Sequence, residues 1–324
     1  MALHEITFTS ANGRDTIQAW VHEPTGAARG VVQVVHGLGE HSRRYLHLTS
    51  TLLDAGFVVV GDDHAGHGRT AMESGVWADA GDDAAQVVVA DTLRVQAEAR
   101  ALPGLDALPW VLYGHSWGSM IARAAATDAD ARLTGLALGG IAAQMHGMEE
   151  VLDRPALAAL AAGEHAAEPA PQELVGQLFD GFLERYGPGA GPTAWVALDA
   201  DVVADHARDP FNNFGAPLSA RFLQGFVDLY DRANGDDWYA SVPAGLPVLI
   251  LAGDQDPVTS YGEGAYHVAN RLVRTGHPDV RTRVFTGVRH EVHNERTTRA
   301  EAEREITDFA TRVTAPDPVV GTSA

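Results

Sequence analysis

Hydrophobic and polar positions repeat along this chain with two different periods. Continuous runs of β-branched and other apolar residues, such as residues 30–35 and 57–60, are typical of strands buried on both faces of a sheet. Other stretches place apolar residues every three or four positions, which is the spacing of one helix face. Because the two kinds of segment alternate, the sequence predicts an α/β protein with a doubly wound, mostly parallel sheet.

Each pattern can be assigned to residue ranges. Strands are predicted at residues 4–10, 15–24, 30–37, 57–64, 108–115, 132–143, 246–256 and 280–287. Core helices are predicted at residues 43–56, 82–102, 116–128, 261–275 and 300–313. An Asn-Gly pair at Asn12 and Gly13 is a strong turn signal, so the first two strands should form a hairpin.

The alternation of strands and helices stops between residues 144 and 244. We interpret residues 144–244 as a helical cap inserted into the core, whose two parts are residues 1–143 and 245–314. The remaining residues, 315–324, are rich in Pro and small side chains, which predicts a disordered tail. The expected organisation is therefore one α/β core interrupted by one insertion.

Two stretches of the insertion, residues 172–187 and 218–233, carry apolar residues at helical spacing. Most amphipathic faces only pack on a core, but a cap also lines the space that it covers. The candidate substrate-binding residues are therefore the aromatic positions of these two faces, Phe179, Phe182, Phe222 and Phe226. Such a lining favours a hydrophobic acyl chain.

Composition narrows the possible partners and chemistry. The chain has 324 residues, 45% of them hydrophobic, and a formal net charge of -20, so it should repel phosphate backbones and bind no nucleic acid. It contains no cysteine, which excludes disulfides, thiolate catalysis and zinc–thiolate sites. Residues 1–10 lack the basic and apolar regions of a secretory signal, and no apolar run is long enough to span a bilayer. We expect a cytoplasmic protein with at most peripheral membrane contact through the cap.

The candidate nucleophile is Ser116, in the pattern Gly114-His115-Ser116-Trp117-Gly118. This G-x-S-x-G pattern lies where a predicted strand meets a predicted helix. A serine on that sharp turn is raised above the sheet, and the glycines leave room for the neighbouring backbone. The context therefore predicts a catalytic serine.

A serine hydroxyl needs a base to accept its proton, and the base needs a carboxylate to orient it. In this strand–turn–helix arrangement the chain order is serine, acid, histidine. Asp256 lies in the loop after the apolar run at residues 246–253 and is preferred over Asp254, whose place nearer that run suits a turn. His290 follows the last strand and is preferred over His293, which lies farther from the sheet edge.

Two backbone N–H groups must stabilise the oxyanion of the tetrahedral intermediate. The expected donors are Trp117, which follows the nucleophile, and Leu38, which lies in the glycine-rich loop after an early strand. Residues 62–70 contain Asp63, His64 and His67, but no further ligand cluster accompanies them, so a hydrogen-bonded turn is expected there. The spacing of HEVH at residues 290–293 does not match a zinc helix, and we predict no metal.

Several blocks of the chain resemble one known family. They are HGLGEHSRRY at residues 36–45, DHAGHGRT at 63–70, GHSWGS at 114–119, GDQDPV at 253–258 and RHEVHNE at 289–295. Together they resemble the monoacylglycerol lipase and lysophospholipase branch of the α/β hydrolases, over most of the chain outside the tail. Two positions depart from the family pattern, since Trp117 stands where Met is frequent and Ala65 where Arg is frequent.

This resemblance implies an α/β-hydrolase fold with a helical cap and no cofactor. It also implies a triad of Ser116, Asp256 and His290 with oxyanion donors at Leu38 and Trp117, in agreement with the reading of the residues themselves. The leading function is a serine carboxylic ester hydrolase that forms an acyl-enzyme. Its small-molecule substrate would be a monoacylglycerol-like or lysophospholipid-like ester with a hydrophobic acyl chain.

Other functions of the same fold remain open at this point. An aminopeptidase of the proline iminopeptidase type would need acidic cap residues for the substrate amine, for which Glu164, Glu168 or Glu184 are available. A lactonase or thioesterase would use the same triad. A ligand-binding relative without catalysis is disfavoured because the triad is complete.

Overall fold

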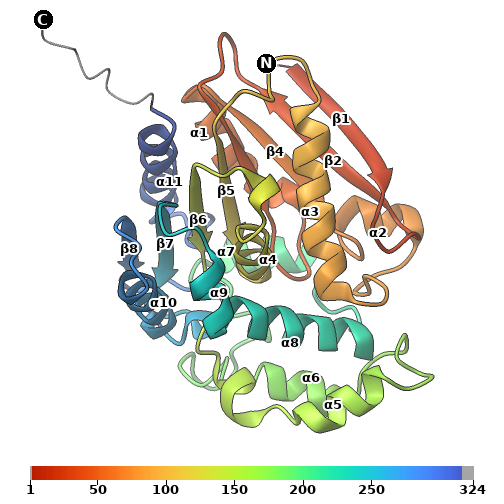
Figure 1. The fold of residues 1–324 in the computed structure, drawn as a ribbon. Coiled ribbons are helices and arrows are strands. Elements are labelled where there is room, and N and C mark those ends of the chain that lie inside the picture. The colour runs from red at the N-terminus through yellow and green to blue at the C-terminus, as the bar shows by residue number, and fades with distance from the viewer. Residues whose placement is uncertain (1, 316–324) are drawn as a thin grey trace, which may run out of the picture.

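The computed structural model describes residues 2–315 and arranges them around one central sheet (Figure 1). Within these residues eight strands lie in the order β1-β2-β4-β3-β5-β6-β7-β8. The strands are β1 Ala2–Thr9, β2 Thr16–Glu23, β3 Gly30–Val35, β4 Phe57–Asp63, β5 Trp110–His115, β6 Gly135–Gly139, β7 Val248–Gly253 and β8 Val280–Phe285. The predicted tail lies outside the described residues except for Ala315.

Helices connect the strands and build the insertion. They are α1 Leu46–Asp54, α2 Gly68–Ser74, α3 Ala84–Arg100, α4 Trp117–Ala125, α5 Arg154–Ala161, α6 Gln172–Leu178, α7 Ala200–Arg208, α8 Ala220–Asn234, α9 Asp236–Ser241, α10 Glu263–Arg274 and α11 Arg299–Val313. Short helical turns occur at η1 Ser42–Tyr45, η2 Ala129–Ala131, η3 Gly147–Val151 and η4 Pro257–Thr259. None of the helices in residues 2–315 is both long and apolar enough to cross a membrane.

The predicted fold class is confirmed by the sheet. β1 and β2 form the expected antiparallel hairpin, in register from Ala2 opposite Glu23 to Thr9 opposite Thr16. β2 also pairs antiparallel with β4, and from β4 to β8 all neighbouring strands are parallel. Because parallel strands end at the same edge, the loops after β3, β5, β7 and β8 meet there.

The inner parallel strands β3, β5, β6 and β7 are buried on both faces because helices cover both. In β5, Val111 and Tyr113 pack into the cluster formed with α1 and α11, whereas Trp110 and Leu112 pack into the cluster formed with α3 and α4. This alternation is the period of two that a strand imposes on its side chains. Figure 1 shows α3 and α4 on one side of the sheet and α11 on the other.

Between β6 and β7 the chain runs through α5 to α9, and we call residues 144–244 the inserted segment. α8 joins this segment to the core, since it packs on α3 and α4 as well as on α5 (Figure 1). The predicted single helix over residues 172–187 is wrong, because α6 ends at Leu178 and Gly181 adopts φ +79°, a left-handed conformation that breaks the helix. The chain then continues in turns toward the end of the sheet.

Candidate active site

Ser116 lies on the sharp turn between β5 and α4. Its backbone is strained, with φ 55° and ψ −124°, a combination that non-glycine residues rarely adopt. A Cβ on Gly114 would lie 2.3 Å from the Gly118 carbonyl oxygen, and one on Gly118 would lie 2.2 Å from the Val35 oxygen. The two glycines therefore permit the close approach of strand, turn and helix that exposes the Ser116 side chain at the edge of the sheet.

Asp256 and His290 are brought together from the loops after β7 and β8. The Nδ1 atom of His290 lies 2.8 Å from Oδ2 of Asp256, and the Asp256 side chain is fully buried. Its other oxygen accepts a hydrogen bond of 2.9 Å from the Val258 backbone N–H. With its two oxygens engaged in this way, the carboxylate fixes the orientation of the His290 ring.

Asp254 has a different position. Its Oδ1 accepts a hydrogen bond of 2.7 Å from the backbone N–H of Gly287 and another of 3.1 Å from the Gln255 side chain. Gly287 belongs to the turn that precedes His290 and has φ +72°. Asp254 thus connects the two loops but does not bond to the imidazole.

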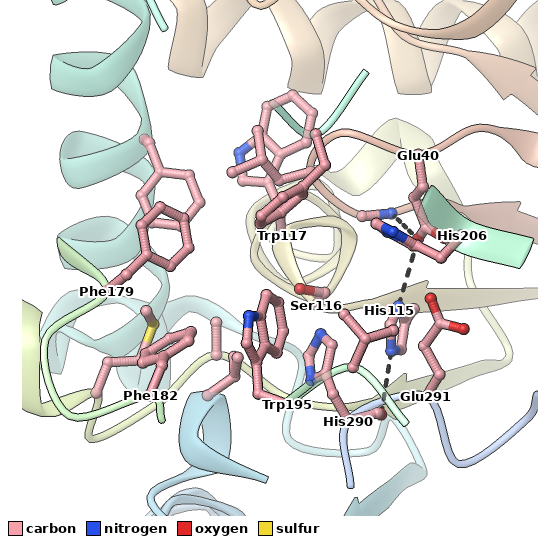
Figure 2. A pocket seen from close by; sticks show the side chains of 18 residues that line it. Glu40, His115, Ser116, Trp117, Phe179, Phe182, Trp195, His206, His290 and Glu291 are labelled. Carbon is pink, nitrogen blue, oxygen red and sulfur yellow. Dashed lines mark hydrogen bonds and ion pairs between the residues drawn. The ribbon is translucent and has the colours of Figure 1, made fainter. Parts of the chain in front are cut away.

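A cavity lies over Ser116. Ser116, His290 and the expected oxyanion donor Trp117 line it (Figure 2). The other expected donor, Leu38, is also among the lining residues. Asp256 is not among the lining residues, and it reaches the cavity only through His290. The structure therefore gathers the predicted residues of all four loops at one site.

The backbone N–H groups of Leu38 and Trp117 are both available at this site, since neither donates to another group within residues 2–315. Trp117 opens α4, and the first N–H groups of a helix have no acceptor inside it. In the other loop the Gly37 N–H is already used, because it donates to Glu40 Oε1 at 2.6 Å. The next N–H along the loop, that of Leu38, donates to no other group in the described part of the chain.

The Glu40 side chain binds to the backbone of this loop. Besides the Gly37 N–H, its Oε1 accepts a hydrogen bond of 2.6 Å from the Tyr45 hydroxyl and lies 3.4 Å from Nδ1 of His115. Burial alone would raise the pKa of the Glu40 carboxyl, but the bond to His115 and the charge of Arg44 hold that pKa well below its usual range. Burial opposes the ionisation of His115, yet its pairing with Glu40 raises its pKa.

Arg44 links this loop to the loop that carries His290. Its guanidinium lies 3.3 Å from Glu40 Oε2 and donates to Glu291 Oε2 at 2.6 Å. Burial alone would raise the pKa of Glu291, but the Arg44 charge lowers it. Sequence reasoning missed the roles of Glu40, Arg44 and Glu291. The run HGLGEHSRRY contains the first two, but their partners come from distant parts of the chain.

His293 is buried among rings beside this network. It stacks on Tyr45 at 4.7 Å between ring centroids and lies 4.6 Å from the His115 ring. Burial and the neighbouring His115 lower the pKa of His293 to about 3, so its imidazole is neutral. No carboxylate bonds to its ring within residues 2–315, and His290 alone of the two histidines is paired with an aspartate.

The histidines of residues 62–70 support the oxyanion side of the cavity. His64 Nδ1 lies 2.8 Å from Asp62 Oδ2, and the His64 ring stacks on His36 at 3.9 Å. His67 stacks on Trp117 at 5.0 Å between centroids, and burial lowers the pKa of His67 to about 4. Only a turn was expected in residues 62–70. In the structure helix α2 begins at Gly68, directly after His67.

Three of the four predicted substrate-binding aromatics line the cavity: Phe179, Phe182 and Phe226. Phe222 does not line it. That ring is packed behind the wall, 5.4 Å from the Trp117 ring and 5.9 Å from His67. The cavity also has two aromatic residues that sequence reasoning missed, Trp195 and Phe214. Both lie in irregular stretches where no helical spacing marks them.

Trp195 is held against the candidate base. Its ring lies 5.0 Å from the His290 ring, and its carbonyl accepts a hydrogen bond from the His290 N–H at 3.4 Å. The next pair is shorter, with the Glu291 N–H donating to the Val196 carbonyl at 2.9 Å. The inserted segment is therefore fastened directly to the loop after β8.

Comparison with known proteins assigns the family. The family described as "Serine aminopeptidase, S33" matches residues 26–297. The chain belongs to this family. It is also 28% identical over 300 residues to a monoacylglycerol lipase of Mycolicibacterium smegmatis, which covers 90% of this chain and 91% of the relative.

Two solved structures are similar over nearly the whole chain. A structure named "Lipase (Open form)" is 56% identical with a TM-score of 0.94, covering 97% of this chain and 100% of the other. A thermostable carboxyl esterase from Bacillus coagulans, solved in complex with glycerol, is 42% identical with a TM-score of 0.92 over 97% and 100% of the two chains. The expected monoacylglycerol lipase-like α/β hydrolase is thus confirmed, and the protein is a hydrolase of the lipase and esterase type.

Proposed function

We propose that this protein is a serine carboxylic ester hydrolase that acts through an acyl-enzyme on esters with a hydrophobic acyl chain. The observation that carries the proposal is the cavity over Ser116, which His290 lines while Asp256 holds the imidazole at 2.8 Å. A strained serine, an oriented histidine and two free backbone N–H groups are the parts that acyl transfer requires.

In the proposed reaction, Ser116 Oγ attacks the ester carbonyl carbon while His290 accepts the hydroxyl proton. The N–H groups of Leu38 and Trp117 donate to the oxyanion that forms. Collapse of the tetrahedral intermediate expels the alcohol, to which His290 returns the proton. Water then attacks the acyl-enzyme by the same route and releases the acid. Each oxyanion donor should contribute about 3 kcal/mol to transition-state stabilisation.

The acyl chain would lie against the aromatic side of the cavity. Phe179, Phe182 and Trp195 form a continuous wall, with Phe182 5.3 Å from Phe179 and 5.1 Å from Trp195 between ring centroids. Residues 144–244 would act as a cap, since they supply these rings over Ser116. Each buried methylene should contribute about 0.8 kcal/mol until the wall is covered.

The family description names an aminopeptidase, which is the second candidate function. An aminopeptidase needs a free carboxylate for the substrate amine. Glu164 and Glu168 have exposed side chains, 87% and 66%, and neither they nor the exposed Glu184 line the cavity. The carboxylates that do line it, Glu40 and Glu291, already pair with Arg44. These positions favour an ester over a peptide with a free amine.

The experiment compares Ser116→Ala with a matched control, Ser241→Ala, whose exposed serine lies at the end of α9. Turnover is measured on p-nitrophenyl esters of increasing chain length and on amino-acid p-nitroanilides. We expect Ser116→Ala to lose ester hydrolysis and labelling by a fluorophosphonate probe, while Ser241→Ala keeps both. Wild-type turnover in folded Ser116→Ala would overturn the mechanism, and faster cleavage of anilides than of esters would favour the aminopeptidase.

A further inference from the structure

One polar atom in the wall of the cavity over Ser116 has no part in the proposed reaction, the indole nitrogen of Trp117. Trp117 lines the cavity and is only 3% exposed. Its Nε1 atom is buried and has no hydrogen-bond partner within residues 2–315. Leaving a buried donor without an acceptor is unfavourable, so such a group in a cavity wall points to a ligand that supplies one.

Two buried indoles elsewhere show the usual arrangement. Trp110 Nε1 donates to Gln33 Oε1 at 3.1 Å, and Trp238 Nε1 donates to the Arg123 carbonyl at 2.7 Å. Neither of these two rings lines the cavity. Of the three indoles, the one without an acceptor is therefore the one that a substrate can reach.

The rings around Trp117 do not supply an acceptor. His67 stacks on the indole with 28° between the two planes and 5.0 Å between centroids, so it covers the face of the ring and not its N–H edge. The nitrogen lies on the edge of the indole that faces the side of the cavity where Phe179 and Phe182 lie (Figure 2). Both of these side chains are hydrocarbon rings, which leaves the Trp117 N–H without an acceptor on this aromatic side.

Trp195, the other indole of the cavity, is in a different situation. Its ring lies 5.1 Å from the Phe182 ring at an interplanar angle of 74°, which is an edge-to-face contact. Figure 2 shows its nitrogen on the Phe182 side, so the Trp195 N–H can donate to the π face of that ring. The indole of Trp117 is thus the donor on the aromatic side that still lacks a partner.

The carboxylates of the cavity lie on the opposite side of Ser116. Glu40 and Glu291 are placed there (Figure 2), and both pair with Arg44. An occupant of the aromatic side must therefore bring an acceptor of its own, and in the proposed function that occupant is the acyl chain. An ether or carbonyl oxygen fits best, because it accepts without donating, whereas a hydroxyl would introduce a donor with no side-chain acceptor beside it.

Resting on the proposed function, we infer that Trp117 Nε1 forms a subsite for an acceptor oxygen within the acyl chain, so that the substrates include esters of oxo- and ether-substituted acids. A purely hydrocarbon wall discriminates against such chains, because it removes water from the oxygen and returns no hydrogen bond. Trp117 then has two separate roles, since its backbone N–H donates to the oxyanion while its indole N–H selects the acyl chain.

The test keeps the alcohol constant and moves one oxygen along the acyl chain. The substrates are p-nitrophenyl decanoate and its 5-oxa, 6-oxa, 7-oxa and 8-oxa analogues, in which an ether oxygen replaces one methylene. The ratio of kcat/KM for each analogue to kcat/KM for the decanoate is compared between wild type and Trp117→Phe, which removes the N–H and keeps an aromatic ring. For the analogue whose oxygen reaches Nε1, this ratio should fall about five- to tenfold in Trp117→Phe, as for one lost hydrogen bond.

A change in catalysis or packing that affects all the esters alike cancels in this ratio. The matched control is Trp20→Phe, which removes an indole that lines a different groove and should leave every ratio unchanged. If Trp117→Phe does not fold, the same ratios are read in Trp117→Met. Ratios that stay within about twofold of wild type for all the analogues would overturn the inference. Failure of the proposed function would look different, because the wild-type enzyme would then cleave neither the decanoate nor any analogue.

Discussion

Replacing Asp256 by Asn tests the proposed acid–base pair most directly. The carboxylate Oδ2 lies 2.8 Å from His290 Nδ1, and no solvent reaches the Asp256 side chain. An amide that turns its NH2 toward Nδ1 favours the tautomer with the proton on Nε2, which cannot accept the proton of Ser116. In a well-studied triad this replacement lowers kcat about 10⁴-fold, which corresponds to about 5.5 kcal/mol in activation free energy.

The fold should survive this change. Asp256 Oδ1 accepts from the Val258 N–H, and the carbonyl of Asn can keep that bond. The matched control is Asp254→Asn, since Asp254 bonds to the Gly287 turn and not to the imidazole. Turnover is measured at saturating p-nitrophenyl ester, with circular dichroism to verify folding. If Asp254→Asn lost as much kcat as Asp256→Asn, or if Asp256→Asn kept more than a tenth of the wild-type value, the assignment of Asp256 would be wrong.

Three further predictions follow from single side chains. Trp117→Met removes indole volume from the cavity wall, so the ester with the highest kcat/KM should have a longer acyl chain, and an unchanged optimum would show that the indole does not limit chain length. Gly118→Ala places a Cβ 2.2 Å from the Val35 oxygen and should cost about 3 kcal/mol or more in chemical unfolding, whereas wild-type stability would contradict this crowding. Burial raises the pKa of Asp91 to about 6, above its value in the unfolded chain, so folding binds a proton there, and Asp91 should contribute a loss of about 2 kcal/mol of stability as pH rises from 4 to 7. Asp91→Asn should lack that loss, and equal pH profiles of unfolding in the two proteins would refute the assignment.

The core could be predicted because its local signals agree with one another. Residues 30–35 and 57–60 are continuous apolar runs, and such runs suit only a strand covered on both faces. The chain order of Ser116, Asp256 and His290 could be predicted for a related reason. Each follows a strand of the parallel sheet, and parallel strands end at the same edge.

The inserted segment was harder to predict, because apolar residues continue at helical spacing beyond the ends of its helices. Phe182 continues the helical spacing of α6, but Gly181 has already turned the chain, and Phe179 and Phe182 face the cavity from irregular backbone. α7 was missed for the opposite reason. Its sequence, ADVVADHAR, has only small apolar side chains, and the helix begins after Asp199, whose side chain accepts a hydrogen bond from the Asp201 N–H. His206 therefore could not be assigned to the cavity from the sequence.

The buried ion pairs could not be predicted at all, since they join residues far apart in the chain. Arg44 and Glu291 are separated by 247 positions and meet only because the loops after β3 and β8 reach the same edge of the sheet. A single sequence contains no pattern for such a pair. Glu40 and Arg44 were visible as charged residues in a predicted glycine-rich loop, but their burial depends on the completed fold.

The position of Glu40 explains why charge is buried beneath the candidate oxyanion loop. A buried carboxylate is costly unless several donors surround it, and Glu40 has the Gly37 N–H, the Tyr45 hydroxyl, His115 and Arg44. An apolar cluster of equal volume could give similar stability, but dispersion contacts have no preferred direction. A hydrogen bond to the Gly37 N–H does fix the direction of the His36–Gly37 peptide, which adjoins the peptide that carries the Leu38 N–H. Oxyanion stabilisation depends on N–H groups that are already oriented when the charge forms. The orientation of the candidate oxyanion loop therefore offsets the free-energy cost of desolvating Glu40.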